Sequence, residues 1–119
     1  MMDLGELKKR LSQFNISEIK STWHGFKRIR DKRRNINYPQ IIFLLTSQKG
    51  LYKFEEQKPR NTENELKFKL WFKLNYLYDM NIYIVINKKP MEKDLNIMEI
   101  ISAHKVKRKI QEKIRKNEN

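Results

Sequence analysis

The feature that most constrains this fold is a long stretch of alternating residues near the middle of the chain. From Leu66 to Tyr78, large apolar or aromatic side chains occupy every second position, and lysines fill most of the positions between them up to residue 73. A repeat of two places one set of side chains on each face of a β-strand. The stretch therefore predicts a long strand with one buried face and one face that carries cations.

Shorter segments on both sides predict further strands in an antiparallel meander. "GLYKFEEQ" at 50–57 and the β-branched "IYIVI" at 82–86 are typical of strands, as is "LNIMEIIS" at 95–102. "DMN" at 79–81 predicts a tight turn between the long strand and the strand that follows it. Together these segments predict four strands that pair in sequence order.

Helical spacing of apolar residues appears before the strands and again after them. It covers residues 3–14, 24–34, 37–49 and 104–116. Asn37 is a good cap for the third of these helices, and Gly50 can end it. Residues 15–23 fit neither period and predict a short strand or an extended lead-in. The fold class that follows is α+β, in which N-terminal helices pack on a four-stranded antiparallel sheet and a basic helix ends a single domain of residues 1–119.

The charge of the chain predicts a polyanionic partner. The sequence has 27 Lys and Arg against 14 Asp and Glu, a net charge of +13. Residues 24–34 carry six of these cations and residues 104–116 carry seven. Nucleic acid is the first expectation, ahead of an anionic membrane surface or an acidic protein. A cationic surface that serves only to keep the protein in solution is the alternative.

Several function classes are disfavoured by what the sequence lacks. The chain has no cysteine, no glycine-rich phosphate loop and no run of carboxylates or histidines with metal-ligand spacing. No apolar segment is long enough to cross a bilayer. We therefore expect a cytoplasmic protein that needs no metal or cofactor and no membrane.

Three residues are candidates for chemistry or recognition. His24 and His104 each begin a basic segment, and histidine can transfer protons near neutral pH while cations stabilise a phosphorane. Trp71 shares the predicted lysine-rich strand face, where it can stack on a base. For each histidine, a surface or capping role is the alternative, and for Trp71 the alternative is burial beneath a helix.

Two motifs resemble those of known toxins. "EIISAHKVKRK" at 99–109 resembles the end of BrnT-type toxins, in which a final strand reads R-I-I-S-A-R and enters a basic helix, so His104 stands where those toxins have arginine. "HGFKRIRDKRRNI" at 24–36 is similar to the H-A-x-x-R-M-x-x-R-G-I segment of a related family of unassigned proteins. With the order of elements, these motifs make the chain similar to the RelE-like toxin ribonucleases of the barnase, EndoU, colicin and RelE group.

The resemblance implies a RelE-like fold and a metal-independent endoribonuclease that binds RNA in a basic groove. It implies RNA, including ribosome-bound mRNA, as substrate and an acidic antitoxin as partner. In that interpretation His24 and His104 transfer protons, and Arg28 and Lys105 stabilise the phosphate. The nucleic-acid-binding candidates are Arg30, Arg33, Arg34, Lys107, Arg108 and Trp71. The rival hypotheses are a non-catalytic protein that binds RNA or DNA with the same surface, and a basic adaptor for an acidic protein.

Overall fold

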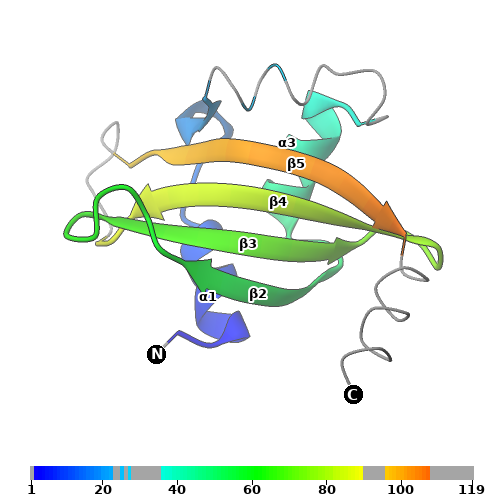
Figure 1. The fold of residues 1–119 in the computed structure, drawn as a ribbon, viewed down its shortest axis with the longest axis horizontal. Helices are drawn as coiled ribbons and strands as arrows, with labels where there is room; N and C mark the ends of the chain where they lie inside the picture. The colour runs from blue at the N-terminus through cyan, green and yellow to red at the C-terminus, as the bar shows by residue number, and fades with distance from the viewer. Residues whose placement is uncertain (1, 23–24, 26, 28–35, 90–95, 108–119) are drawn as a thin grey trace.

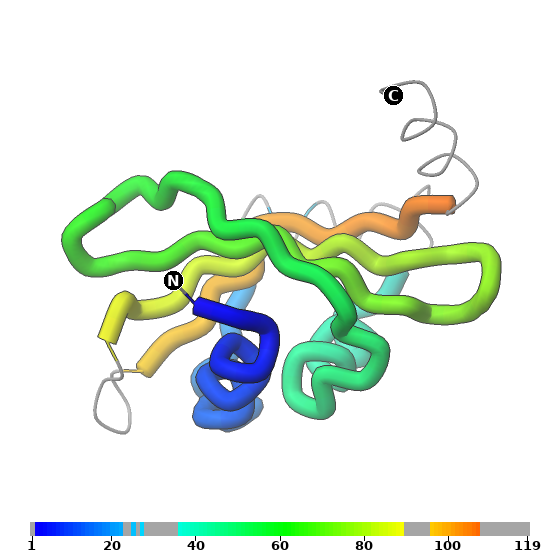
Figure 2. Tube along the Cα trace, turned by 90° about the horizontal axis from the view of Figure 1, so that it is seen from below, coloured from blue at the N-terminus to red at the C-terminus, as the bar shows by residue number. Residues whose placement is uncertain are grey.

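In the part of the chain that the structure describes, one sheet carries two α-helices on the same face. The computed structural model describes residues 2–22, 25, 27, 36–89 and 96–107. Helices α1 and α3 lie behind the sheet in Figure 1 and beneath it in Figure 2. In chain order, the described elements are α1 (Leu4–Leu11), the 3-10 helix η1 (Ile16–Glu18), β1 (Ile19–Ser21), α3 (Tyr38–Ser47), β2 (Leu51–Gln57), β3 (Glu65–Lys73), β4 (Tyr78–Asn87) and β5 (Met98–Lys107).

The sheet has five strands in the order β1-β5-β4-β3-β2, and it is mixed. Strands β2 to β5 pair antiparallel in sequence order, whereas β1 pairs parallel with β5, with Ile19 opposite Met98. The predicted four-stranded antiparallel sheet is therefore wrong. The short strand that the sequence allows within residues 15–23 is present as β1. Its pairing with β5 joins two segments that lie far apart in the sequence, so no local pattern reveals the fifth, parallel position in the sheet.

The turn between β3 and β4 also differs from the prediction. β3 ends at Lys73, and the Oδ1 atom of Asn75 accepts hydrogen bonds of 2.9 Å from the backbone N–H groups of Leu77 and Tyr78. This local bond is typical of an asparagine turn. Residues 79–81 consequently belong to β4 rather than to a turn, and Tyr76 is 81% exposed at the hairpin tip.

The end of β5 contradicts a third prediction. Residues 104–107 continue the strand and do not begin a helix, because their Cα partners in β4 run from Asn81 back to Tyr78. The earlier start of β4 supplies these partners. The remainder of the predicted C-terminal helix, residues 108–116, lies outside the described residues. So does the predicted helix at 24–34, except for residues 25 and 27.

Local capping explains where the two helices begin. The side chain of Asp3 accepts a hydrogen bond of 2.8 Å from the Glu6 N–H at the start of α1, and Asn37 does the same for Gln40 at the start of α3. Such caps contribute about 1 kcal/mol each. The predicted cap at Asn37 is thus confirmed, and α3 ends at Ser47, before Gly50.

The core lies between the helices and one face of the sheet. Side chains from α1 and α3 pack on alternating residues of the three central strands. The fully buried large side chains are Leu7, Leu11, Ile41, Leu45, Phe68, Leu70, Phe72, Met80, Ile82, Ile84, Ile86 and Met98. Burying each contributes about 1.5–3 kcal/mol. Arg10 ties α1 to the end of β4 through a 3.1 Å bond to the Asn87 carbonyl, and burial lowers the pKa of this guanidinium.

Candidate nucleic-acid interface

The sheet face opposite α1 and α3 carries the candidate site, and we call it the open face. Because side chains alternate along each strand, the neighbours of the core residues point to this side. No helix in the described part of the chain lies on it (Figures 1 and 2). Its side chains are those of Lys53, Glu55 and Gln57 from β2, Glu65, Lys67, Lys69, Trp71 and Lys73 from β3, Asp79, Asn81, Tyr83, Val85 and Asn87 from β4, and Glu99, Ser102, His104 and Val106 from β5.

The strand register places four of these residues in one row across the sheet, which we call the aromatic row. Lys53 pairs with Trp71, Trp71 with Asn81, and Asn81 with His104. Paired residues of antiparallel strands have Cβ atoms about 5 Å apart on the same face. The row therefore brings an indole, an amide and an imidazole side by side, although they come from three different strands.

Aromatic and cationic side chains contact each other along this row and the next one. The ammonium groups of Lys53 and Lys69 lie 4.7 and 4.5 Å from the centroid of the Trp71 ring. The Lys69 ammonium also lies 5.6 Å from the Tyr83 ring, and Tyr83 stacks on His104 with centroids 5.9 Å apart. Trp71 is only 6% exposed, and the two lysines lie over its ring.

Buried polar groups surround these rings. The hydroxyl of Tyr52 donates a short hydrogen bond to the carboxylate of Asp79, which has no exposed surface. Asn81 is 3% exposed, and its Oδ1 atom has no hydrogen-bond partner among the residues that the structure describes. Ser102 is also buried. Buried polar groups cost free energy unless they are paired, and of these side chains only Asn81 has a buried atom without a partner in the described part of the chain.

Charge is unevenly distributed over the open face. At one end, Arg60 forms ion pairs of 3.2 Å with Glu65 and 3.4 Å with Glu99. The carboxylates of Glu99 and Glu65 raise the pKa of the Arg60 guanidinium. The lysines near Trp71 lie away from this end. Around Trp71, the three lysines Lys53, Lys69 and Lys73 outnumber the carboxylates of Glu55 and Asp79 by one, so the aromatic centre carries a small cationic excess that the Arg60 end lacks.

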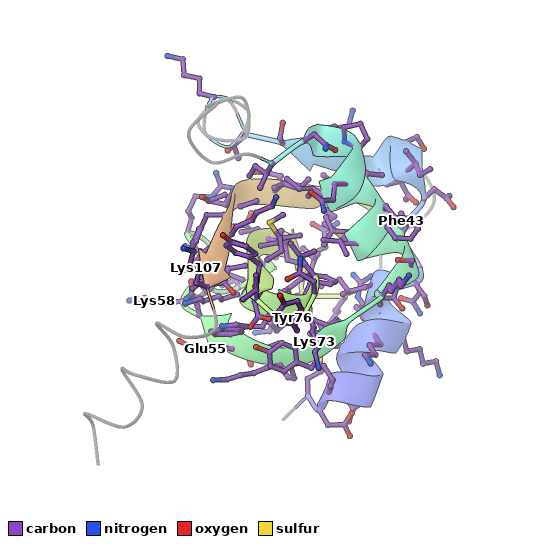
Figure 3. The ribbon with its side chains drawn as sticks, turned by 90° about the vertical axis from the view of Figure 1, so that its right-hand side faces the viewer. Phe43, Glu55, Lys58, Lys73, Tyr76 and Lys107 are labelled. Atoms are coloured by element: carbon purple, nitrogen blue, oxygen red, sulfur yellow. The ribbon has the colours of Figure 1, made fainter. Side chains whose placement is uncertain are left out.

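The structure brings together two of the residues singled out in the sequence and separates a third. His104 and Trp71 lie in the same row of the open face. Lys105 points to the opposite face, because it is paired with the core residue Met80. Lys107 is exposed at the end of β5 (Figure 3). His24, Arg28, Arg30, Arg33, Arg34 and Arg108 lie outside the described residues.

Gly25 shows where the first basic segment begins. Its backbone N–H donates a 3.0 Å hydrogen bond to the Thr22 hydroxyl, and a Cβ atom added to it would lie 2.6 Å from the carbonyl oxygen of Ile100. The chain at Gly25 is therefore packed against β5. His104 belongs to β5 as well. The start of the first basic segment therefore packs against the same strand that contributes His104 to the aromatic row.

Three residues of the open face carry no signal that singles them out in the sequence. The pattern places Asn81 in a turn at 79–81, and Lys53 and Tyr83 resemble ordinary strand residues. The tendency of Asn75 to form an asparagine turn is the signal that moves the turn and places Asn81 in the strand. Tyr83 and Lys53 have no comparable local signal, because their importance comes from the partners that the register gives them.

Comparisons with known proteins add no relative. No protein-family profile, curated protein or solved structure matches the chain. Within the described ranges, no three histidine or acidic side chains are grouped so as to hold a metal ion. The helices among the described residues are too short or too polar to span a bilayer.

Proposed function

We propose that the protein binds single-stranded RNA on the open face. The observation that carries this proposal is the arrangement of Trp71 beside the stacked rings of Tyr83 and His104, with lysine ammonium groups in contact with them. Stacking on aromatic side chains and contact of cations with the phosphates are the two interactions by which proteins hold single strands. A sheet face offers the bases a flat surface, whereas a duplex keeps its bases stacked inside.

RNA must displace two lysines to reach the ring of Trp71. The ring is only 6% exposed, and a lysine over a desolvated ring contributes about 2 kcal/mol. A base stacked on an aromatic side chain contributes about 1–3 kcal/mol, so stacking alone does not offset the loss of both lysine contacts. In this proposal the released ammonium groups of Lys53 and Lys69 pair with phosphates of the RNA, and these ion pairs supply the remainder.

The sequence supplies further cations after the last residue of β5. β5 leads at Lys107 into residues 108–116, in which the sequence has five Lys or Arg and one Glu. The net charge of +13 supplies long-range attraction for a polyanion. In this proposal the open face contacts the bases, and lysines and arginines of the chain neutralise the backbone.

Charge reversal at matched sites tests the proposal. Lys67→Glu with Lys73→Glu alters the open face, and Lys9→Glu with Lys49→Glu places the same net charge on the helix side. Fluorescence anisotropy with a labelled single strand should show roughly tenfold weaker binding for the first variant than for the second. The slope of log K against log salt should fall by about 0.7 for each phosphate that the variant no longer neutralises. Equal losses of affinity in both variants, or tighter binding of duplex RNA than of single strands, would contradict the proposal.

A second candidate function is metal-independent cleavage of the bound RNA, as in a toxin-like endoribonuclease that an acidic antitoxin restrains. The observation that favours it is the position of His104 within the aromatic row, next to Asn81 and stacked on Tyr83. An imidazole beside a bound strand can take a proton from a 2′-hydroxyl or give one to a leaving oxygen.

Cleavage and binding are separated by His104→Gln. If the protein is a ribonuclease, this variant should lose about 100-fold or more of its cleavage rate, which is typical for a general acid or base, while its affinity for RNA changes little. The assay follows a labelled RNA in the presence of EDTA, and growth of cells that express the chain alone is the second readout. Wild-type protein that binds RNA, leaves it intact and permits normal growth would limit the function to binding.

A further inference from the structure

The amide of Asn81 is a polar group that the open face leaves unsatisfied. Its Oδ1 atom is buried and accepts no hydrogen bond from the residues that the structure describes. Buried acceptors in folded proteins are nearly always paired, with protein or with ordered water. Asn81 lies within β4, and its partners on β3 and β5 are both described, so the strands around it supply no donor.

The surroundings of Asn81 suit a flat ligand. Trp71 is its neighbour on one side and His104 on the other, and Tyr83 lies two positions further along the same face of β4. Lys69 bridges the rings of Trp71 and Tyr83 with its ammonium group. A molecule that reaches Asn81 must therefore have apolar faces that fit between rings and a polar edge that faces the amide.

We propose that Asn81 reads the edge of a nucleobase stacked on Trp71, an inference that rests on the RNA-binding function proposed above. The exocyclic amino group of the base donates its N–H to the Oδ1 atom of Asn81. Cytosine carries this amino group at C4, where uracil has a carbonyl oxygen that can only accept. Only the Oδ1 atom of the Asn81 amide is buried without a partner, and this oxygen can accept from cytosine but cannot pair with the uracil carbonyl. Asn81 therefore favours cytosine over uracil, two bases of the same size and similar stacking area.

Access to the face of Trp71 requires two side chains to move. Lys53 and Lys69 are long and flexible, and their ammonium groups lie over the Trp71 ring. Phosphates of the RNA attract these ammonium groups away from the ring, which opens its face to a base beside Asn81. Backbone binding and base reading are thus coupled through the two lysines.

The test compares short oligocytidylate and oligouridylate of equal length, together with an abasic strand that offers only sugar and phosphate. The full-length wild-type protein should bind the cytidylate about tenfold more tightly than the uridylate, the discrimination expected for a base-edge contact. Asn81→Val removes both polar atoms of the side chain and suits a strand. It should bind the two oligonucleotides equally, keep its affinity for the abasic strand, and melt no lower than wild type because a buried unpaired oxygen is removed.

Asn96→Val is the matched control. The Oδ1 atom of Asn96 is also buried without a partner in the described part of the chain, but Asn96 precedes β5 and is not in the aromatic row. This variant should retain the preference for cytosine. Asn81→Asp is a second test that does not depend on a loss of binding, since a carboxylate still accepts from the cytosine amino group and should keep the preference.

The outcomes distinguish this inference from the proposed function. If single strands bind the open face but the preference for cytosine is absent in wild type or survives in Asn81→Val, RNA binding stands and base reading by Asn81 is overturned; an ordered water then satisfies the oxygen. If single strands do not bind the open face at all, both proposals fail. A large fall in melting temperature for Asn81→Val would also count against the inference, because it would show a structural role.

Discussion

At the scale of single residues, Trp71 is the centre of the proposed interface. Its ring is apolar and large, yet it lies on the sheet face that has no described helix, and two lysines lie over it. The sequence leaves two interpretations of Trp71, burial beneath a helix or stacking on a base. The structure shows a third arrangement, in which the protein's own cations lie over the ring.

Replacing Trp71 by leucine separates stacking from burial. Trp71→Leu keeps an apolar side chain but removes the aromatic face, so binding of single-stranded RNA should weaken by about 1–3 kcal/mol, the contribution of one stacked base. Titration by fluorescence anisotropy measures this change in affinity, and circular dichroism checks the fold.

Phe43→Leu is the control for Trp71→Leu. Phe43 is an exposed aromatic residue on α3, on the opposite side of the molecule from Glu55 and Lys107 (Figure 3). Its replacement should leave RNA binding unchanged. An equal loss of affinity in both variants, or no loss in Trp71→Leu, would rule out Trp71 as a stacking residue.

At the scale of elements, the connection between α3 and β2 depends on Gly50. Its φ angle of 82° is in the left-handed region, and its carbonyl accepts a 2.8 Å hydrogen bond from the Lys73 N–H at the end of β3. An added Cβ atom would lie 2.5 Å from the Lys73 carbonyl oxygen. Glycine at this position is therefore required for the close approach of two backbones as well as for the turn.

Gly50→Ala should destabilise the protein by about 2 kcal/mol or more, because it adds both backbone strain and a clash with β3. Thermal or urea denaturation followed by circular dichroism measures the change.

Gly5→Ala is the control for Gly50→Ala, and its expected effect on stability has the opposite sign. A Cβ atom added to Gly5 in α1 would lie 3.4 Å from the Asp3 Oδ1 atom, an ordinary van der Waals distance, and alanine in a helix should add about 0.5–1 kcal/mol. If Gly50→Ala were as stable as wild type, the approach of Gly50 to Lys73 would have to be looser than described.

At the scale of the whole molecule, the net charge of +13 sets how the protein responds to salt and to polyanions. Excess charge of one sign destabilises the compact state through self-repulsion. Screening reduces that repulsion, since the Debye length falls from about 30 Å at 10 mM salt to about 10 Å at 100 mM.

Thermal unfolding should therefore shift upward over this range of salt, and single-stranded RNA at low salt should shift it further. A ligand present at 100 times its dissociation constant adds about 2.7 kcal/mol to the free energy of unfolding. Differential scanning fluorimetry measures both shifts, with polylysine as the control that should give none. A melting temperature that falls as salt is added would show that ion pairs such as those of Arg60 outweigh the self-repulsion.

Some of this architecture follows from local patterns. The alternation at residues 66–73 identifies β3 together with its cationic face, because the period of two depends only on neighbouring residues. Asn37 identifies the start of α3 for the same reason, since a cap bonds to a backbone group three residues away. The same alternation continues to Tyr78, and there it is misleading, because β3 ends before Asn75 and neither Tyr76 nor Tyr78 extends it.

The candidate site is a product of tertiary structure. β1 joins β5, β5 extends to Lys107, and the row of Trp71, Asn81 and His104 forms only when three strands adopt one register. Local spacing and composition are enough to show which segments favour strands or helices, which strand face is cationic, and that the chain is strongly basic. They do not show which polar and aromatic side chains meet, because pairing between distant strands depends on contacts that the spacing of neighbouring residues does not encode.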